Sequence, residues 1–548
     1  MTKKYKTIRE VKERGDQAVG KSIKDLVTSE NVENWYLSPK NKGWLGRAIE
    51  KDWFGLENDN ISGADFKNLG VELKSTGLKF FKREKIWAAK ERLVLNVFDF
   101  DKEYKKDFYN STFYQKSNLI QLLLYKYEPT SYFDFQGKRY PTYPDFLITH
   151  SILFNLKDLP KKDLAIIEND WNFIKNMIIQ GKAEHISESM TEYLGAVTKG
   201  GKKIENQVSQ PFSEVKAHQR AFSLKPAYMK EITRQILNGE IKNSTSYQSY
   251  TLDYPEFYDL QRYQSTITRE NIINDIQILK QKSFEEIILN KIEPFHGRTK
   301  VDLAKELGIS IKKVNDKASS RLIAQKIFNL ENDLEETEEF NKAGISLKIL
   351  TVDSKQLRKE SENRVTKEAF KLESHVDFIE GITNLNWEDS RVFEYLSTTK
   401  FLIVVFEKTS EGDVLKGSKF WYMPEDDLEI VRKTWELIKN TLMDGLDLTY
   451  KKIQVKKKDK KNKKNKKDFK VLNNLPSQSR GPNILHIRPS AGESHYYKST
   501  NSSKLPSPST WTDRPSQLKN QLTDFYMVKQ AFWLNKDYMY QQIKDLFE

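Results

Sequence analysis

Hydrophobic residues near the start of the chain recur at helical spacing, and further along they alternate or form short runs. The segment 41–54, NKGWLGRAIEKDWF, predicts an amphipathic helix because its apolar residues lie on one stripe. A polar, glycine-containing segment follows at 57–64. Residues 69–75 then alternate, which predicts a strand with Glu72 and Lys74 on one face and apolar residues on the other.

Further strands and helices are predicted in both halves of the chain. Apolar runs predict buried strands at 91–98 and 119–127, and a helix is expected around 160–180. In the second half a helical pattern begins near Ile272, and the run FLIVVF at 401–406 predicts a buried strand. Runs of this length are far too short to span a bilayer. The mixture of strands and helices predicts an α/β protein with mixed sheets flanked by helices.

One stretch of predicted helix, loop and strand occurs twice. Residues 47–74 and 321–348 align without a gap and share 11 of 28 residues, whereas average composition predicts roughly two matches by chance. The apolar pattern is kept, so we expect the fold to be kept. The acidic positions differ: Glu50, Asp65 and Glu72 of the first copy correspond to Ala324, Glu339 and Ser346 of the second.

The repeat also indicates how the chain is divided. A length of 548 residues is too great for one core, and an offset of 274 residues gives two halves of ordinary domain size. We expect a first domain at 1–238 and a polar, tyrosine-containing linker at 239–271. The second domain is then 272–548.

The positive charge is concentrated in one tract. Residues 451–470 hold twelve lysines and two aspartates, so they supply +10 of the formal net charge of +14. This tract is predicted as an insertion between two strands. One interpretation is a solvated loop, and the other is an arm that lies on nucleic-acid phosphates. The lysines proposed to contact DNA are Lys456, Lys457, Lys458, Lys460, Lys461, Lys463 and Lys464.

The candidate chemistry lies in the first copy of the repeat, in the pattern D-x6-E-x-K formed by Asp65, Glu72 and Lys74. Glu72 and Lys74 are two apart on a strand, so both point to one face, and the chain before the strand can fold the carboxylate of Asp65 back toward them. Two carboxylates suit Mg²⁺, which binds few protein groups and keeps several waters. A lysine beside the metal can orient and help deprotonate an attacking water. The pattern is short, and an exposed salt bridge on a strand is the alternative interpretation.

Two segments carry a family resemblance: NKGWLGRAIE at 41–50 and ADFKNLGVELKST at 64–76. They resemble the mismatch-repair nicking endonuclease MutH and the Sau-three-A type of GATC-cutting restriction enzymes. The resemblance implies a restriction-endonuclease-like fold in both halves. It also implies metal ligation by Asp65 and Glu72, catalysis by Lys74, and support of this network by Glu50. The stretch 111–128 resembles a family segment with a further active-site lysine, which carries that role to Lys116.

Downstream segments resemble parts of the family that contact DNA. EYLGAVTKG at 192–200 resembles a segment that reaches into the DNA groove, so Thr198 and Lys199 are candidate contacts; a polar hairpin turn is the alternative. In the second half, ILHIRPSAGES at 484–494 resembles the same segment, which makes Arg488 a candidate contact. Arginine forms bidentate contacts with guanine but binds phosphate as readily. The segment 297–316 has the pattern of a helix-turn-helix, which either reads bases or is plain structure.

Other chemistries fit the sequence poorly. The chain has no cysteine, which excludes disulfides and fits a reducing cytoplasm. Its seven histidines are scattered, without a metal-binding motif, and no Walker-type phosphate loop is present, so an ATP-driven activity is not expected. The N-terminus is too polar for a signal peptide, and no membrane association is expected.

These observations lead to one principal interpretation. The chain is expected to be a type II restriction endonuclease that uses Mg²⁺ to cleave double-stranded DNA, with GATC and the 5′-phosphate and 3′-hydroxyl ends implied by the resemblance. The second domain is expected to bind another copy of the site and activate cleavage. One complete site per chain predicts that two chains meet on DNA to cut both strands. A MutH-like mismatch-repair nickase and a non-enzymatic DNA-binding regulator are the alternatives.

Overall fold

Two compact units make up the chain in the computed structural model. Unit 1 comprises residues 1–291 and 325–346, and unit 2 comprises 292–324 and 347–548. Residues 272–291 and 325–346, which the sequence interpretation assigned to the second domain, therefore group with unit 1. The structure describes residues 4–548 except 40, 42, 57–62, 83, 137, 200–203, 241–267, 311–317, 373–374, 454–468 and 479–483. Most of the predicted linker lies outside the described residues.

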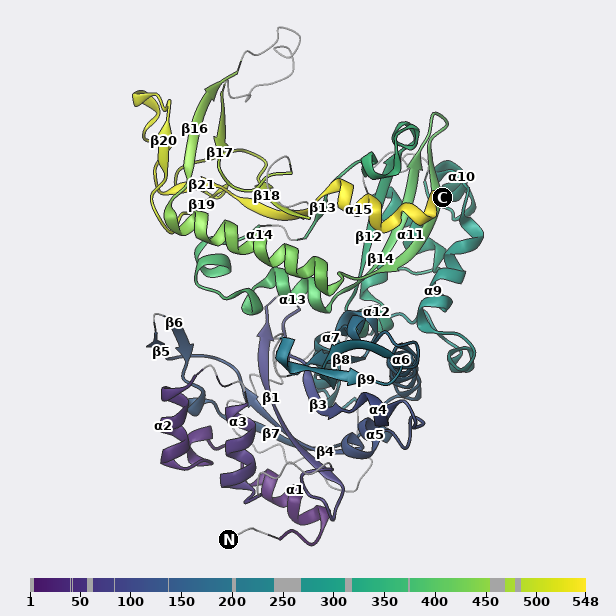
Figure 1. Cartoon of the computed structure of the whole chain (residues 1–548), viewed down its shortest axis with the longest axis vertical. Helices are drawn as coiled ribbons and strands as arrows, with labels where there is room; N and C mark the ends of the chain where they lie inside the picture. Colours follow the sequence, from purple (N-terminus) through teal and green to yellow (C-terminus); the bar gives the residue numbers. More distant parts are fainter. Residues whose placement is uncertain are drawn as a thin grey trace. The chain divides into compact units, whose positions relative to one another are not determined.

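Unit 1 begins with three short helices, α1 (Ile8–Asp16), α2 (Ser29–Leu37) and α3 (Trp44–Ala48) (Figure 1). The helix α3 continues as a π-helical turn over Ile49–Trp53. The predicted amphipathic helix is therefore present, but its second half is wound more loosely than an α-helix. Four residues of its apolar stripe are buried, namely Trp44, Leu45, Ala48 and Ile49. The fifth, Trp53, is half-buried.

The central sheet of unit 1 has the strand order β2-β1-β4-β7. Its strands are β1 (Val71–Phe81), β2 (Ile86–Ala89), β4 (Leu119–Lys126) and β7 (Ile148–Asn155). The central pair β1 and β4 is parallel, whereas β2 and β7 run antiparallel to their neighbours, so the sheet is mixed as predicted. The strand expected from residue 69 begins only at Val71, because Gly70 has a φ of +65° that ends the preceding turn.

A smaller antiparallel sheet of order β3-β11-β8 completes the core of unit 1. Its strands are β3 (Leu93–Phe98), β8 (Leu194–Thr198) and β11 (Arg220–Leu224). The remaining strands are β5 (Tyr132–Phe135), β6 (Lys138–Pro141), β9 (Gln207–Gln210) and β10 (Ser213–His218). The helices are α4 (Phe100–Glu103), α5 (Thr112–Ser117), α6 (Lys161–Ile179), α7 (Pro226–Leu237) and α12 (Glu338–Ala343).

Unit 2 repeats the two-sheet plan. Its sheets have the orders β12-β14-β15 and β13-β22-β18. The strands are β12 (Ile345–Asp353), β13 (Phe370–Lys371), β14 (Lys400–Lys408), β15 (Asp413–Trp421), β18 (Leu485–Pro489) and β22 (Gln530–Leu534). The long helix α14 (Glu425–Asp444) corresponds in chain order to α6, and both carry a buried tryptophan, Trp435 and Trp171. The predicted tandem arrangement of two similar α/β folds, with sheets flanked by helices, is thus present.

The other elements of unit 2 surround this plan. They are α10 (Lys300–Glu306), α11 (Ser319–Ile327), α13 (Arg391–Thr398), α15 (Lys536–Ile543), β16 (Asp447–Lys452), β17 (Phe469–Asn473), β19 (Ser502–Lys504), β20 (Thr510–Thr512) and β21 (Tyr526–Val528). The helix α9 (Phe284–Ile292) belongs to unit 1 except for its last residue. The α9 and α11 helices and β12 each cross the division between the units.

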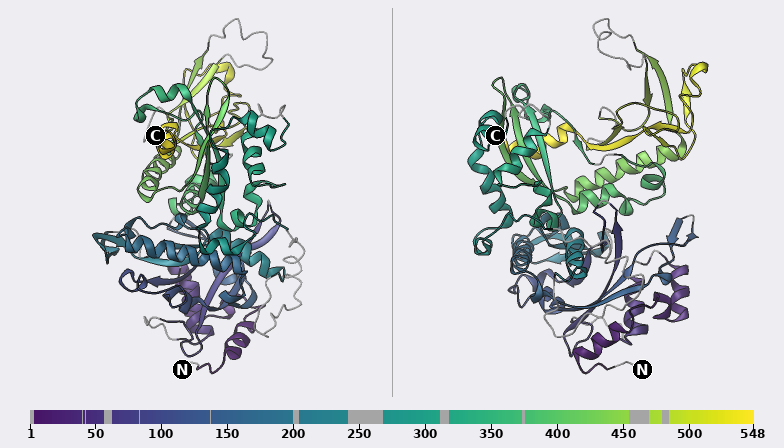
Figure 2. Two further views of the ribbon diagram at one scale, coloured as in Figure 1. Left: turned by 90° about the vertical axis from the view of Figure 1, so that its right-hand side faces the viewer. Right: turned by 180° about the vertical axis from the view of Figure 1, so that it is seen from behind.

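The strands β16 and β17 form an antiparallel ribbon that extends past α14 in the views of Figures 1 and 2. Lys452 pairs with Phe469, so the lysine tract is an insertion between two paired strands, as predicted. The seven lysines proposed to contact DNA lie outside the described residues. So does the second part of the helix-turn-helix candidate, of which the structure describes α10.

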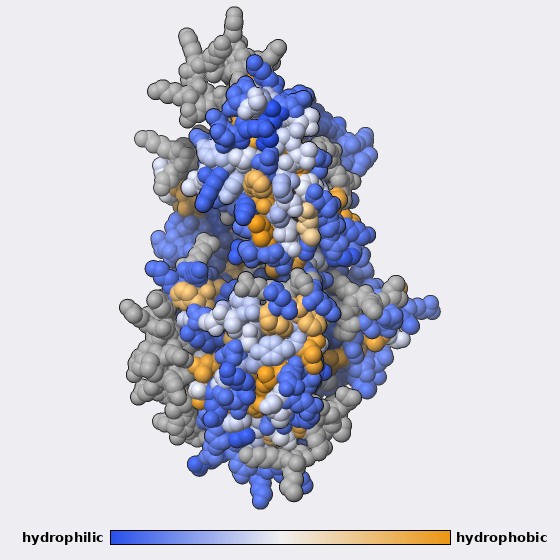
Figure 3. Space-filling model, turned by 90° about the vertical axis from the view of Figure 1, so that its left-hand side faces the viewer, coloured by the Kyte–Doolittle hydropathy of each residue, from blue (hydrophilic) through white to orange (hydrophobic). Residues whose placement is uncertain are grey.

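Hydrophobic residues on the face shown in Figure 3 are scattered in small patches among hydrophilic ones. Among the residues that the structure describes, no helix combines the length and the apolar composition that crossing a bilayer requires.

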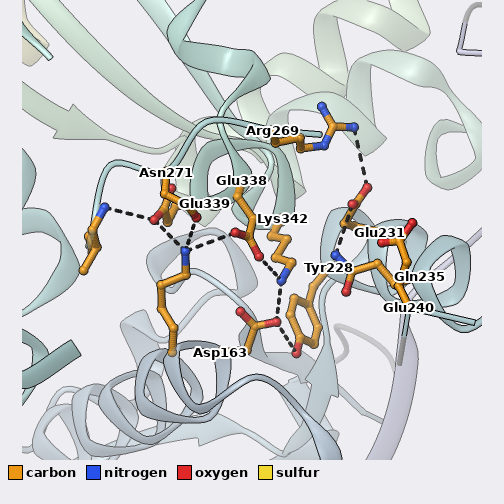
Figure 4. Close-up of polar contacts among 12 residues, drawn as sticks. Asp163, Tyr228, Glu231, Gln235, Glu240, Arg269, Asn271, Glu338, Glu339 and Lys342 are labelled. Carbon is orange, nitrogen blue, oxygen red and sulfur yellow. Dashed lines mark hydrogen bonds and ion pairs between the residues drawn. The ribbon is translucent and has the colours of Figure 1, made fainter. Parts of the chain in front are cut away.

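Buried ion pairs join the segment 325–346 to the rest of unit 1 (Figure 4). The side chains of Lys342 on α12 and Asp163 on α6 are both 0% exposed, and Lys342 Nζ lies 2.7 Å from Asp163 Oδ2. Lys342 also pairs with Glu338 at 2.7 Å, and Tyr228 of α7 donates to Asp163. Burial opposes the charge on Lys342, but the two carboxylates outweigh it and raise the pKa of this ammonium.

Candidate active site

Glu72 and Lys74 are the second and fourth residues of β1, and both lie on the face that the alternation predicted. The carboxylate of Glu72 is only 1% exposed and accepts a hydrogen bond from Lys74 Nζ at 2.5 Å. Lys116 Nζ lies 3.5 Å from the same Glu72 oxygen. Two cations from different elements therefore converge on one buried carboxylate, and each keeps part of its side chain exposed to solvent (19% for Lys74 and 26% for Lys116).

Asp65 is folded back onto β1 by a tight turn. Phe66 donates its backbone N–H to the carbonyl of Val71 at 2.9 Å, which closes the turn. The carboxylate of Asp65 then accepts the backbone N–H of Leu73 at 2.8 Å, and the Asp65 N–H donates to Glu72 at 3.3 Å. These bonds place the two carboxylates side by side, as the position of Asp65 before the strand predicted.

Lys116 is positioned by a residue that the sequence interpretation missed. Glu103 is 1% exposed, and its carboxylate accepts from the N–H of Thr112 at 3.2 Å and from Trp171 Nε1 at 2.9 Å. Since Thr112 is the first residue of α5, this carboxylate fixes the helix that carries Lys116 against α6. No motif marks Glu103, because its partners are 9 and 68 residues away.

Glu50, on the π-helical turn, belongs to the same electrostatic environment. Burial and the charge of Asp65 raise its pKa, while Lys74 and Lys116 act in the opposite direction. Burial also raises the pKa of Glu72 to about 7, although the lysines partly offset it. The structure thus brings together all five residues of the predicted site, with more buried negative charge than the two lysines compensate.

The predicted DNA-contact residues of unit 1 follow the end of β8. Thr198 accepts a hydrogen bond from the buried Arg220 at 2.8 Å, and Lys199 donates its backbone N–H to the carbonyl of Gln219. Burial lowers the pKa of Lys199, and the charge of Lys74 adds to this, so the two ammonium groups lie within electrostatic reach of each other. The charge of Lys199 is therefore coupled to that of the carboxylate–lysine site.

A second buried carboxylate sets the position of β8. Asp170 of α6 is 1% exposed and accepts the backbone N–H groups of Glu192, Tyr193 and Leu194 at 2.7–2.9 Å. Three hydrogen bonds to one carboxylate fix the chain immediately before the strand that leads to Thr198 and Lys199. Sequence reasoning also missed this residue, which carries no local signal.

Two comparisons with known proteins found relatives of this chain. Residues 54–170 match the model of a family described as DNA mismatch repair enzyme MutH, a range that includes Asp65, Glu72, Lys74 and Lys116. The chain is also 31% identical over 556 aligned positions to the type II restriction enzyme Sau3AI of Staphylococcus aureus, with 99% of each chain covered. The chain belongs to the MutH/Sau3AI family. Its membership extends through both units, because the match to Sau3AI spans nearly the whole chain.

In this MutH/Sau3AI-family chain, the second copy of the repeat lacks the carboxylate arrangement. Ser346 replaces Glu72 and donates to Glu335 at 2.7 Å, and Ala324 replaces Glu50. Glu339, at the position of Asp65, is 0% exposed and accepts the N–H groups of Ile272 and Ile273 at 3.0 Å each, together with Lys162 at 2.9 Å. This carboxylate is fully used in the ion cluster of Figure 4.

Arg488, the candidate contact of unit 2, lies on β18. Its guanidinium is 3.8 Å from the centre of the Trp533 ring, and burial lowers its pKa. Arg488, His486, Ser477 and Gln478 line a surface pocket. Within the described parts of both units, no group of three or more His, Cys, Asp or Glu is arranged to hold a metal ion.

Proposed function

We propose that this chain is a Mg²⁺-dependent endonuclease that cleaves double-stranded DNA at GATC with the site of unit 1, while unit 2 binds a second copy of the sequence and activates cleavage. One observation carries the proposal. Five residues expected to form a nuclease site converge in unit 1, and the corresponding acidic positions in the second copy of the repeat are lost or used elsewhere. The restriction-enzyme relative, matched across both units, supports the two-part organisation.

The donor set in unit 1 fits Mg²⁺. Asp65 and Glu72 offer adjacent carboxylate oxygens, and a hard cation with few protein ligands and several waters is suited to such a pair. The buried Glu72, whose pKa is raised by burial, would be stabilised as an anion by a cation at this position. When bound, the ion would supply Lewis-acid stabilisation of the charge on the phosphate.

The side chains of unit 1 would perform the remaining steps. Lys74 reaches from Glu72 toward solvent, where it can orient a water for in-line attack and take part in its deprotonation. Lys116, held by α5, is placed to stabilise negative charge on the phosphate as the bond to the leaving 3′-oxygen breaks. The product is then a 5′-phosphate and a 3′-hydroxyl. Thr198 and Lys199 would contact DNA beside this point.

The two alternative functions are less well supported. A mismatch-repair nickase is favoured by the MutH model, but that match covers only residues 54–170. A non-enzymatic regulator would not require the assembled carboxylates and lysines of unit 1. Restriction of DNA in the cell, with two chains meeting to cut both strands, is therefore the function we propose.

Digestion of a defined linear duplex with one GATC tests this function. We expect two product strands with 5′-phosphate ends in Mg²⁺, none in excess chelator, and restoration when Mg²⁺ is added back. A matched duplex with GTAC in place of GATC should remain intact. Sequencing of the ends identifies the cut, and cleavage of the GTAC duplex at the same rate would contradict the proposed specificity.

A further inference from the structure

A basic pocket occupies the place in unit 2 that corresponds to the active site. Its volume is about 510 Å³, and Lys300, Lys348, Lys367 and Lys371 are among the residues that line it. The acidic side chains of its lining are Glu368 and Asp413. Since Lys300 already pairs with Asp413 at 2.7 Å, three lysines face one exposed carboxylate. The pocket has a net positive charge.

Lys348 is the counterpart of Lys74, at the offset of the repeat. The ammonium of Lys74 bonds to Glu72, whereas Lys348 has Ser346 two residues before it. Instead of an acid, two aromatic rings lie near Lys348 Nζ, with the centres of Phe370 and Tyr395 at 5.0 and 5.8 Å. Rings of this kind orient a cation without neutralising its charge. In the described part of unit 2, no carboxylate pairs with this ammonium.

Lys371 supplies an ammonium group at the place of Lys199, although it comes from a different strand, β13. The strands β11 and β22 share the pattern Ala-Phe-x-Leu, and Val197 and Arg488 pair with the alanine of each. Two residues further on, Lys199 and Ser490 make the same backbone bond, to Gln219 and Lys529, at 2.8 and 2.9 Å. Ser490 is therefore the equivalent of Lys199. Its hydroxyl accepts from Lys371 Nζ at 2.7 Å, so an ammonium group is again present there.

The comparison shows a selective loss. Lys74 of the active site and the DNA-contact candidate Lys199 have counterparts in Lys348 and Lys371, while the carboxylates have none that faces this pocket. A half-buried pair of cations without an acid partner suits a single anionic oxygen group, and phosphate is the anion that DNA offers at every position. Removal of the carboxylates also removes the ligands that Mg²⁺ would require.

We propose that this pocket binds one backbone phosphate of the second DNA site without a metal ion, with Lys348 and Lys371 as its cationic ligands. This inference rests on the proposed role of unit 2 as a DNA-binding effector. Unit 2 would thus bind DNA at the place in its fold that corresponds to the cutting site of unit 1, but without the carboxylates that cleavage requires. Arg488, whose guanidinium shares the Trp533 ring with Lys371, would extend the cationic surface along the DNA.

The test measures binding of a labelled GATC duplex to the full chain in excess chelator, and stimulation of cleavage by added GATC duplex in Mg²⁺. The double variant K348M/K371M should bind about tenfold more weakly, and the slope of log K against log salt should fall by about one. It should also need more added duplex for half-maximal stimulation. The control K433M/K544M removes two exposed lysines of the same unit and should change neither quantity.

These experiments distinguish failure of the effector function of unit 2 from failure of the pocket assignment. If the wild-type chain shows no stimulation by a second duplex, the effector function itself fails. If stimulation is present but K348M/K371M retains the wild-type affinity and salt slope, only the pocket assignment fails. The charge-conserving variant K348R/K371R should retain binding, and equal far-ultraviolet circular dichroism of all variants shows that they are folded.

Two further outcomes would overturn the inference. A second duplex that binds only when a divalent ion is present would contradict the metal-free site. Inorganic phosphate, compared with chloride at equal ionic strength, should displace the duplex only weakly from the wild-type chain. If free phosphate binds more tightly than the duplex and loses this affinity in K348M/K371M, the pocket is a site for a free anion and not for DNA.

Discussion

The strands β1 and β12 begin in the same way, but their lysines have different partners. Both follow a glycine in the left-handed region, Gly70 with φ +65° and Gly344 with φ +66°, and both carry a lysine four residues later. In β1 that lysine meets a buried carboxylate, and in β12 it meets aromatic rings. A fold can therefore be kept while its acids are lost, which separates the residues that shape the site from those proposed to perform catalysis.

The largest expected effect comes from the lysine of β1. Lys74→Met should lower the rate of cleavage by about 10³-fold or more, since the group that positions water and balances Glu72 is removed. Lys79→Met, an exposed lysine on the same strand, is the matched control and should cleave at the wild-type rate. Single-turnover digestion of a one-site duplex measures both. Substantial cleavage by the Lys74 variant would remove the functional distinction between the two strands.

The buried ion cluster provides a comparison of stability. Lys342→Met should lower the free energy of unfolding by about 3–5 kcal/mol, because it leaves Asp163 buried without its cation. The aligned residue of the first copy is Asn68, which is exposed, and Asn68→Ala should cost less than about 1 kcal/mol. Urea unfolding monitored by tryptophan fluorescence gives both values. A loss below 1 kcal/mol for Lys342→Met would show that the cluster does not stabilise unit 1.

The lysine tract between β16 and β17 should affect affinity without affecting sequence selectivity. Deletion of 456–467 removes nine lysines and should weaken binding of GATC and GTAC duplexes by the same factor, with a smaller salt slope. Titration of both duplexes at several salt concentrations measures this. An unchanged salt slope would make the tract a solvated loop, the alternative that its composition allows.

The smallest expected effect is that of adding an acid to the second copy. Ser346→Glu places in the second copy the acid that the first copy has at Glu72. We nevertheless expect no cleavage from the second copy when this change is made in a Glu72→Gln background. The second carboxylate that a metal site would need there is Glu339, which aligns with Asp65. Glu339 is already bonded to two backbone N–H groups and to Lys162, and it has no exposed surface. Recovery of Mg²⁺-dependent cutting in the double variant would show that unit 2 is closer to a nuclease than we infer.

Local patterns predicted much of the fold and of the candidate site. Alternation placed Glu72 and Lys74 on one face, and the apolar stripe predicted the helix that ends near Glu50, because both follow from the geometry of single elements. The family resemblance supplied Lys116. The electrostatic coupling of Lys199 to Lys74 then emerged from the structure.

Long-range contacts set the limits of prediction. Glu103 and Asp170 act through partners far away in sequence, so neither has a local signal. The grouping of 325–346 with unit 1 depends on Lys342 meeting Asp163 across 179 residues, which no periodicity reveals. The correspondence of Lys371 with Lys199 is likewise visible only through the register of β18 with β22 and a bond to Ser490.

The central claim is that cutting belongs to unit 1 and that unit 2 only binds. Its most direct test is the Glu72→Gln variant of the full chain, assayed in Mg²⁺ with a labelled GATC duplex for both cleavage and the number of duplexes bound per chain. We predict no cleavage and two duplexes bound per chain. Cleavage at a rate near that of the wild type, or a single duplex bound per chain, would contradict the claim.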